Sequence, residues 1–461
     1  MSLVKAREQL HDLDPAVRRR ALERLVSQAA PDDPRTPPVV NLHCHTIFSY
    51  SGYGHSPASL AWLAREQGWY ALGTVDFDVL DGVDETLWAT DLVGVRGVSG
   101  LETRVHWPEY LHWEFNSPGE PGVIYFEGIG FAASTPAPAA VSTLDDMRQR
   151  AAQRNREMVE RVNAHLHPVI IDYEADVLPL TPSGNATERH ILVAYDAAAR
   201  ERYPQRNALV AFWADKLGMA AEEVEAFLGG DLNRPPAPHD AIRSRLMKRG
   251  GVGYVQPGTD TFPALDEVIQ AILACGAMPC HTWLDGTSEG EKHLDELMPL
   301  LIDKGVAALT VIPDRNWNIA DPDERTIKVR NFHEIMGLAR DLAVPVLAGT
   351  EMNKAGQRDL DDFDVEPLQP YRDDLIQAAD IVYGHTVLQR ALGLGYVSDW
   401  AQAHLPDRRG RNAYYAQVGR TVAGVVPNAG TGAVERVAAL DGAGLDADAL
   451  LRRLGDMFCA A

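Results

Sequence analysis

The chain has 461 residues, of which 46% are hydrophobic and 23% are charged, and this composition is typical of globular proteins. Its formal net charge is −22, which opposes strong nucleic-acid binding because polyanions are repelled over most of the surface. No stretch approaches the ~20 apolar residues that cross a bilayer, so no membrane contact is expected. The first twenty residues lack the apolar core of a secretion signal, so we expect a cytoplasmic location. Nothing in the sequence indicates an oligomeric state.

The chain order indicates one main domain with helical additions. Residues 1–36 are expected to form a helical arm, because apolar residues recur among charges and prolines then end the pattern. Residues 37–400 alternate short apolar runs with amphipathic stretches, which is typical of βα units. Within them, residues 196–250 are predicted as a helical, Pro-rich insertion or cap. Residues 401–461 are predicted as a helical extension.

Eight apolar runs are strand candidates. They lie at residues 39–43, 71–75, 98–104, 123–131, 277–282, 308–313, 344–351 and 381–385. Helical stretches between several of them favour a parallel sheet closed into one α/β barrel. Four cysteines are too few and too scattered for a disulfide framework or a CxxC zinc site, and they are expected to be reduced thiols.

Metal-compatible side chains recur at the ends of these runs. His43 and His45 are two residues apart, so in extended chain both imidazoles face one side and can reach one metal. The downstream candidates are Asp76, Glu102, His190, His281 and Glu351. Barrel active sites are built where parallel strands end, so this recurrence predicts a shared metal site.

These motifs resemble those of the PHP (polymerase and histidinol phosphatase) superfamily over roughly residues 38–390. The matching segments are 41–46 with the HxHT pattern, 71–76, 100–102, 280–281 and 349–351. The resemblance implies a distorted (β/α)7 TIM-like barrel, two or three metals and hydrolysis of phosphoesters. It implies that His43 and His45 bind one metal, Glu102 bridges to a second, and His281, His190 and Glu351 are further ligands.

The sequence departs from the family at several places. Ser51, Phe77 and Asn353 stand where the family's third metal has its ligands, although His55 is a candidate substitute. A histidine usual on the strand after Glu102 is missing, with His112 or Glu127 as stand-ins. We therefore expect one or two divalent ions, Zn, Mn or Fe.

Asp76, His190 and His385 are the predicted catalytic residues. For His385 three roles remain open: a metal ligand, a general acid or a structural histidine. A divalent metal lowers the pKa of the water it binds, which supplies a nucleophile at neutral pH. A small phosphorylated substrate is expected to be bound by cationic side chains, for which the candidates are Arg189, Arg243, Lys248 and Lys354. The basic run that holds Arg243 and Lys248 is equally well explained as a solvated helix face.

Two other functions remain open. An amidohydrolase-type enzyme acting on C–N bonds also opens with HxH on a barrel strand, but it requires a mid-barrel lysine that this sequence does not place at a strand end. The other alternative is a degenerate barrel that binds a ligand without catalysis. The lost third-metal positions motivate it.

Overall fold

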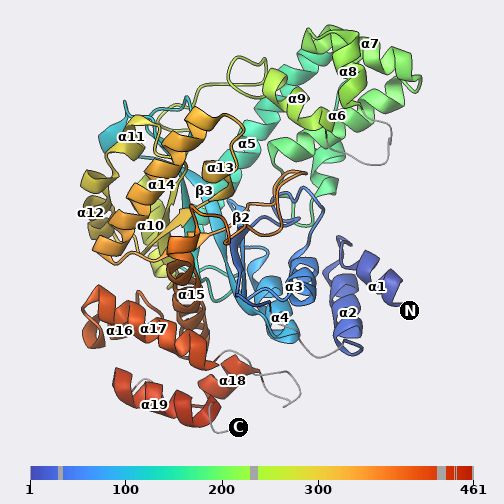
Figure 1. The fold of residues 1–461 in the computed structure, drawn as a ribbon. Helices are drawn as coiled ribbons and strands as arrows, with labels where there is room; N and C mark the ends of the chain where they lie inside the picture. The colour runs from blue at the N-terminus through green and yellow to red at the C-terminus, as the bar shows by residue number, and fades with distance from the viewer. Residues whose placement is uncertain are drawn as a thin grey trace.

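Seven strands form one sheet that nearly closes into a barrel (Figure 1). The computed structural model describes residues 2–29, 35–228, 237–422, 432–440, 442 and 444–458. The strands are β1 (Val40–Cys44), β2 (Ala71–Phe77), β3 (Arg96–His106), β4 (Val123–Ile129), β5 (Met278–Trp283), β6 (Ala308–Val311) and β7 (Val346–Ala348), paired in that order. Beyond β7, the Glu351 N–H donates to the His43 carbonyl at 2.8 Å and the His45 N–H donates to the Glu351 carbonyl at 2.7 Å. These two bonds join the last strand segment to the first.

Strand β4 runs antiparallel to both of its neighbours, whereas the other neighbouring pairs are parallel. This reversal distinguishes the barrel from a regular TIM barrel and confirms the distorted form. It also sets Glu127 of β4 directly opposite Glu102 of β3 and beside Cys280 of β5. Paired residues share a face of the sheet, so Glu102 and Glu127 point to the same side.

Helices cover the outside of the barrel and both of its ends (Figure 1). Those before β5 are α1 (Leu3–Gln9), α2 (Pro15–Val26), α3 (Pro57–Glu66), α4 (Val83–Val93), α5 (Val141–Leu166), α6 (Glu188–Arg202), α7 (Arg206–Leu217), α8 (Ala221–Phe227), α9 (Ala237–Leu246) and α10 (Leu265–Ala274). Those after it are α11 (Glu289–Lys292), α12 (Leu294–Lys304), α13 (Asp314–Trp317), α14 (Pro322–Leu342), α15 (Arg372–Leu392), α16 (Asp399–His404), α17 (Arg408–Val422), α18 (Ala433–Ala438) and α19 (Ala447–Phe458). No helix among these described residues is long and apolar enough to span a membrane.

The helices α6 to α9, with the second half of α5, form a separate unit at one end of the barrel (Figure 1). They share a hydrophobic core that runs from Val159 to Met247 and is distinct from the core of the barrel. The Asn185 amide fixes this unit to the barrel by donating to the carbonyls of Phe48 at 3.1 Å and Phe77 at 2.8 Å, just after β1 and at the end of β2. The unit therefore stands over the carboxyl ends of the strands. Pro235 and Pro236 of the predicted insertion lie outside the described residues.

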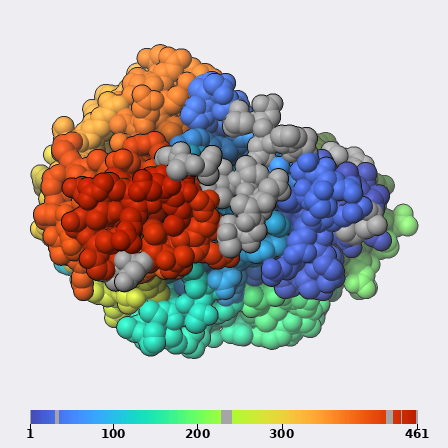
Figure 2. Space-filling view, turned by 90° about the horizontal axis from the view of Figure 1, so that it is seen from below, coloured from blue at the N-terminus to red at the C-terminus, as the bar shows by residue number. Residues whose placement is uncertain are grey.

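The opposite end of the barrel is covered by α15 and the C-terminal helices. Asp380 of α15 accepts from the Tyr70 hydroxyl at 2.8 Å and lies 3.7 Å from Arg96, and both partners are at the amino ends of β2 and β3. Viewed from below, C-terminal residues cover a broad part of this face beside the N-terminal arm (Figure 2). Arg18 of the arm is buried and pairs with Glu85 of α4.

Seven of the eight predicted strands are confirmed, and the eighth is wrong. Residues 381–385 lie inside helix α15, because a short apolar run that is buried all round has no periodicity to separate strand from helix. His385 is completely buried there, with its Nδ1 accepting from the Tyr396 N–H at 2.8 Å and its Nε2 donating to the Gly130 carbonyl at 3.0 Å. These contacts are those of a structural histidine at the amino ends of the parallel strands, away from the predicted catalytic end.

Replacing His385 by alanine is expected to destabilise the protein without changing metal content. The change leaves the buried Tyr396 N–H and Gly130 carbonyl without partners and opens a cavity, at a total cost of about 3–5 kcal/mol. Urea unfolding followed by circular dichroism measures the loss, and elemental analysis of the folded variant measures the metal. Loss of metal from a variant of unchanged stability would contradict this placement.

Candidate metal centre

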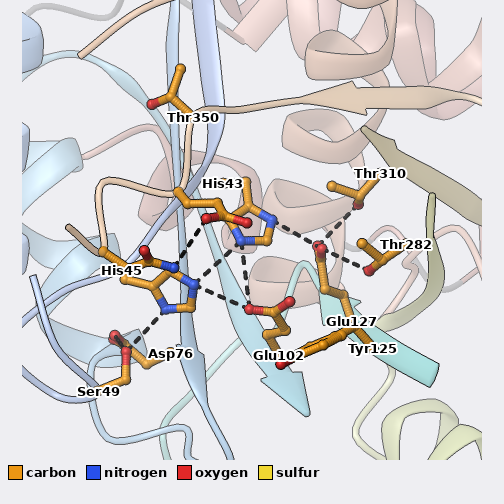
Figure 3. A network of polar contacts seen from close by, with 12 residues as sticks. His43, His45, Ser49, Asp76, Glu102, Tyr125, Glu127, Thr282, Thr310 and Thr350 are labelled. Atoms are coloured by element: carbon orange, nitrogen blue, oxygen red, sulfur yellow. Dashed lines mark hydrogen bonds and ion pairs between the residues drawn. The ribbon is translucent and has the colours of Figure 1, made fainter. Parts of the chain in front are cut away.

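Two histidines and one glutamate bring their ligand atoms together inside the barrel (Figure 3). The Nε2 atoms of His43 and His45 are 3.4 Å apart. Glu102 Oε2 lies 3.6 Å from the first and 3.1 Å from the second. All three side chains are buried, with exposed fractions of 1%, 0% and 5%. The two imidazoles come from successive same-facing positions at the end of β1, and Glu102 comes from β3.

The loop after β1 fixes the ring of His45. Asp76, at the end of β2, accepts from the Thr46 N–H at 2.8 Å, the Thr46 hydroxyl at 2.7 Å and the Ser49 hydroxyl at 2.7 Å. Because the single Ser49 hydrogen is donated to Asp76, the Ser49 oxygen accepts from Nδ1–H of His45, at 3.0 Å. The His45 lone pair is then on Nε2, the atom that faces Glu102. Asp76 therefore fixes the conformation of the loop after β1 through these hydrogen bonds. Its assigned catalytic role stays a prediction.

A second carboxylate fixes the ring of His43. Glu127 is fully buried, and its Oε1 lies 3.0 Å from Nδ1 of His43. Its two oxygens also accept hydrogen bonds from Thr282 at 3.1 Å and Thr310 at 3.0 Å (Figure 3). The contact lacks the alignment of a hydrogen bond. A carboxylate this close to Nδ1 nevertheless favours the hydrogen on that atom and leaves the lone pair on Nε2, as in the arrangement that supports metal-binding histidines. Glu127 therefore contacts the side of the His43 ring that faces away from the cluster, and it is not one of the three converging ligands.

The cluster places three electron-pair donors close together in the buried interior of the barrel. Two imidazole lone pairs and a carboxylate oxygen point at one another, so a positive charge is required among them. In the absence of a cation, a proton on His43 would meet the same requirement. Burial alone would lower the pKa of His43, but Glu127 and Glu102 raise it well above its usual value. Burial would raise the pKa of Glu102, but the two histidines lower it. The donor set, two nitrogens and one oxygen with supporting hydrogen bonds, fits a divalent transition metal.

Glu351 lies beside this cluster but is occupied by other partners. Its Oε2 accepts from Arg315 at 2.6 Å, Asn353 at 3.1 Å and Gln357 at 3.0 Å. Burial acts to raise its pKa, but Arg315 and His43 outweigh this effect and the pKa is lowered. Glu351 and Met352 both have positive φ, of 65° and 54°, so the backbone turns sharply here. In the structure Glu351 is the anchor of Arg315, and its role as a ligand stays a prediction.

The positions that depart from the PHP pattern have other contacts. The Phe77 ring stacks on His45 with ring centroids 4.4 Å apart, so it closes one side of the cluster with an apolar wall. Asn353 donates to Glu351. His55, the candidate substitute, contacts Ser59 through Nδ1 at 3.0 Å and lies against the ring of His11 from the N-terminal arm. Among the described residues, the grouping of three or more potential metal ligands consists of His43, His45 and Glu102 alone.

His281 is not brought to the cluster. Thr282 points into the barrel toward Glu127, so its neighbour His281 points to the opposite face, on the same side as Phe126. Both of its ring nitrogens are buried without a hydrogen-bond partner, and burial lowers its pKa to about 4. The sequence places His281 near the end of an apolar run, but the strand continues to Trp283 and the run alone does not show which face each residue occupies.

His190 lies in the first turn of α6, at the edge of the helical unit over the barrel. Its Nδ1 accepts from the Thr187 N–H at 3.1 Å, and its ring meets Tyr50 edge-on at 5.1 Å. Burial lowers its pKa to about 4, so the ring is neutral at neutral pH and carries its hydrogen on Nε2. This tautomer suits a hydrogen-bond donor to a substrate better than a metal ligand.

The four predicted substrate-binding cations are divided between the helical unit and a loop. Arg243 and Lys248 both contact Glu188 Oε2, at 2.8 and 3.2 Å, and Arg189 contacts Asp240 at 3.2 Å. Lys354 is exposed in the loop after Glu351. Sequence reasoning missed Arg315, which follows β6 by four residues. The strand-end rule that selected the carboxylates would also have selected this cation.

A change at Glu127 is expected to weaken metal binding without touching the ligands. Glu127→Gln keeps the size of the side chain but removes the charge behind His43, and loss of such a supporting carboxylate typically costs about 10–100-fold in metal affinity. Competition with a chelating dye measures the affinity. Thr310→Val, which removes one of the hydrogen bonds to Glu127, should give a smaller effect in the same direction. Equal affinities in wild type and Glu127→Gln would contradict the assigned role.

Comparison with known proteins gives distant structural similarity. No protein-family model and no curated protein matches the chain. Among solved structures, one neighbour is an amidohydrolase from Chromobacterium violaceum, with sulfate bound and no metal, at 14% identity and a TM-score of 0.44 over 73% of this chain and 96% of the other. Another is a protein assigned as a metal-dependent phosphoesterase from Bifidobacterium adolescentis ATCC 15703, at 18% identity and a TM-score of 0.46 over 74% of this chain and 98% of the other.

Proposed function

We propose that this protein is a metal-dependent hydrolase that cleaves phosphoesters. The observation that carries the proposal is the convergence of His43 Nε2, His45 Nε2 and Glu102 Oε2 in a buried space, with each histidine oriented by a partner at Nδ1. A divalent cation held by these atoms supplies Lewis acidity, which activates water and offsets negative charge on a phosphoryl group. The PHP resemblance of the motifs agrees with this assignment.

The surrounding residues favour an anionic substrate. Arg315 reaches the cluster through Glu351, and its side chain is 43% exposed, so its guanidinium is open to a ligand. A planar guanidinium held in place by a carboxylate is well suited to bind a phosphoryl oxygen. The Nε2–H of His190 is a neutral hydrogen-bond donor above the same end of the barrel. Phe77 shields His45 from water on one side.

The test combines metal analysis with a substrate screen. The protein is purified without chelator, reconstituted separately with Zn, Mn and Fe, and assayed on phosphomonoesters, phosphodiesters and cyclic amides. We expect at least one equivalent of metal and turnover of a phosphoester. Turnover of cyclic amides alone would favour a C–N hydrolase. Substoichiometric binding of all three metals would favour a non-catalytic barrel.

A further inference from the structure

Four cationic side chains from different segments gather between the barrel and the helical unit. Arg104 comes from β3, Arg154 from α5, Arg243 from α9 and Lys248 from the turn after α9. Their side chains are largely shielded, with exposed fractions of 23%, 25%, 26% and 40%. Each of the four is partly buried and faces a carboxylate. We call these four residues the cation cluster.

The carboxylates that face the cation cluster are fewer than the cations. Glu188 contacts both Arg243 and Lys248, Glu120 lies 3.1 Å from Arg104, and Asp78 is 4.0 Å from Arg154. Asp240 also acts on Arg243, but it pairs with a fifth cation, Arg189, at 3.2 Å. Four carboxylates therefore face five cations, and Glu188 is shared between two of them. Burial and the neighbouring cations lower the pKa of Arg154 to about 10, although Asp78 acts in the opposite direction. The same two causes lower the pKa of Lys248, whereas at Arg104 and Arg243 the neighbouring carboxylates and Tyr125 outweigh burial and raise the pKa. The cluster has an excess of positive charge inside a chain of net charge −22.

An aromatic ring holds two of the guanidinium groups in position. The Cζ atoms of Arg104 and Arg154 lie 4.3 and 4.6 Å from the centroid of Phe262. Phe262 itself is buried, and the segment that follows it is attached to β3 by the bond from the His106 N–H to the Pro263 carbonyl at 2.8 Å. The two arginines are thus ordered before any ligand binds, which reduces the entropy cost of binding.

The cation cluster lies beside the metal centre. Arg104 follows Glu102 by two residues on the same face of β3, a separation of about 7 Å along a strand. Tyr125, opposite Arg104 in β4, is close enough to both Arg104 and Glu102 for their charges to act on its pKa, which burial raises. The candidate metal ligands and the cation cluster therefore lie side by side at the same end of the barrel.

We propose that the cation cluster binds a second anionic group of the substrate, so that the enzyme acts on compounds with two phosphates, or a phosphate and a carboxylate, a few bonds apart. This inference rests on the proposed phosphoesterase function for the group that is cleaved. Arg104 contacts the second anion from the barrel, and Arg154, Arg243 and Lys248 contact it from the helical unit. The substrate then bridges the two parts of the protein.

The binding test is independent of catalysis. Inorganic pyrophosphate is titrated into the full-length protein in the presence of EDTA, and the heat of binding is measured by calorimetry. We expect one saturable site. Arg154→Gln and Lys248→Gln should each raise the dissociation constant about tenfold or more, because each removes a charge-assisted contact. Lys248 is the more exposed of the two, so its variant is the safeguard if Arg154→Gln fails to fold.

The matched control is Arg156→Gln. Arg156 lies on the same helix as Arg154 but pairs with Glu174 at 2.7 Å outside the cluster, so its loss should leave pyrophosphate binding unchanged. Absence of saturable binding, or equal weakening by all three variants, would overturn the proposal. If binding follows the expected pattern but no phosphoester is turned over, the proposed function fails and the anion site stands.

A kinetic comparison then tests the substrate class. For the metal-loaded enzyme, Arg154→Gln should lower kcat/KM for an ester with a second anionic group about tenfold and leave a neutral-tailed monoester nearly unchanged. Arg154→Lys should recover part of the loss because it restores the charge. Equal losses on both esters would contradict a role for the cation cluster in recognising the second anion.

Discussion

Glu102→Gln and His43→Ala are each expected to abolish hydrolysis and to release the metal while leaving the fold intact. Each removes one of three converging ligand atoms, so the loss in metal affinity should exceed the roughly 10–100-fold that supporting residues contribute. Loss of kcat/KM should be larger than about 100-fold for the same reason. Elemental analysis, circular dichroism and phosphoester assays measure the three properties.

The control for this experiment is His404→Gln, because His404 is exposed on α16 and lies in the C-terminal region, at the end of the barrel opposite the metal centre. This variant should retain full metal content and activity. A Glu102→Gln protein that keeps both its metal and its turnover would remove Glu102 from the site and, with it, the mechanism proposed above.

The protein is expected to lose stability steeply as the pH falls from about 6.5 to about 4. His190, His281 and His385 are buried, and burial lowers the pKa of each to about 4. Over this pH range the unfolded chain takes up protons that the folded chain does not, so the free energy of unfolding falls with falling pH. Each histidine contributes up to about 3 kcal/mol, which is a large part of a typical total stability.

Urea unfolding at several pH values measures this dependence. His281→Leu is the most informative variant, because His281 has two buried nitrogens without partners and a leucine of similar size needs none. We expect the variant to be at least as stable as wild type at pH 7 and to lose less stability at pH 5, with an unchanged metal content. Loss of metal from His281→Leu would instead support its predicted role as a ligand.

The same experiment separates His281 from His43. Burial would lower the pKa of His43, but Glu127 and Glu102 raise it. In the metal-free protein its contribution to stability is therefore present at low pH and is lost as the pH rises through its folded value, opposite to the other three histidines. Chelator-treated protein should accordingly show a weaker net acid dependence than metal-loaded protein, because His43 as the proposed ligand cannot take up the proton.

The local sequence determined the strands of the barrel and the three residues at the centre of the candidate site. Apolar runs bounded by turns locate β1 to β7, and the period of two places His43 and His45 on one face whatever follows in the chain. Glu102 was selected by the same strand-end rule, although β3 continues four residues beyond it to His106. The placement of the strands and of the two histidines succeeds because it depends on backbone geometry over a few residues.

Only the tertiary structure decided the remaining roles. The reversal of β4 set Glu127 against His43, and no local pattern reports the direction of a strand. Thr282 occupies the inward face of β5, so the neighbouring His281 points outward. Because the run is apolar on both faces, the sequence does not show which of its residues point inward. The cation cluster is assembled from segments more than 140 residues apart, from Arg104 to Lys248. Contacts of such separation depend on how the helical unit packs on the barrel, and the sequence near each residue carries no record of that packing.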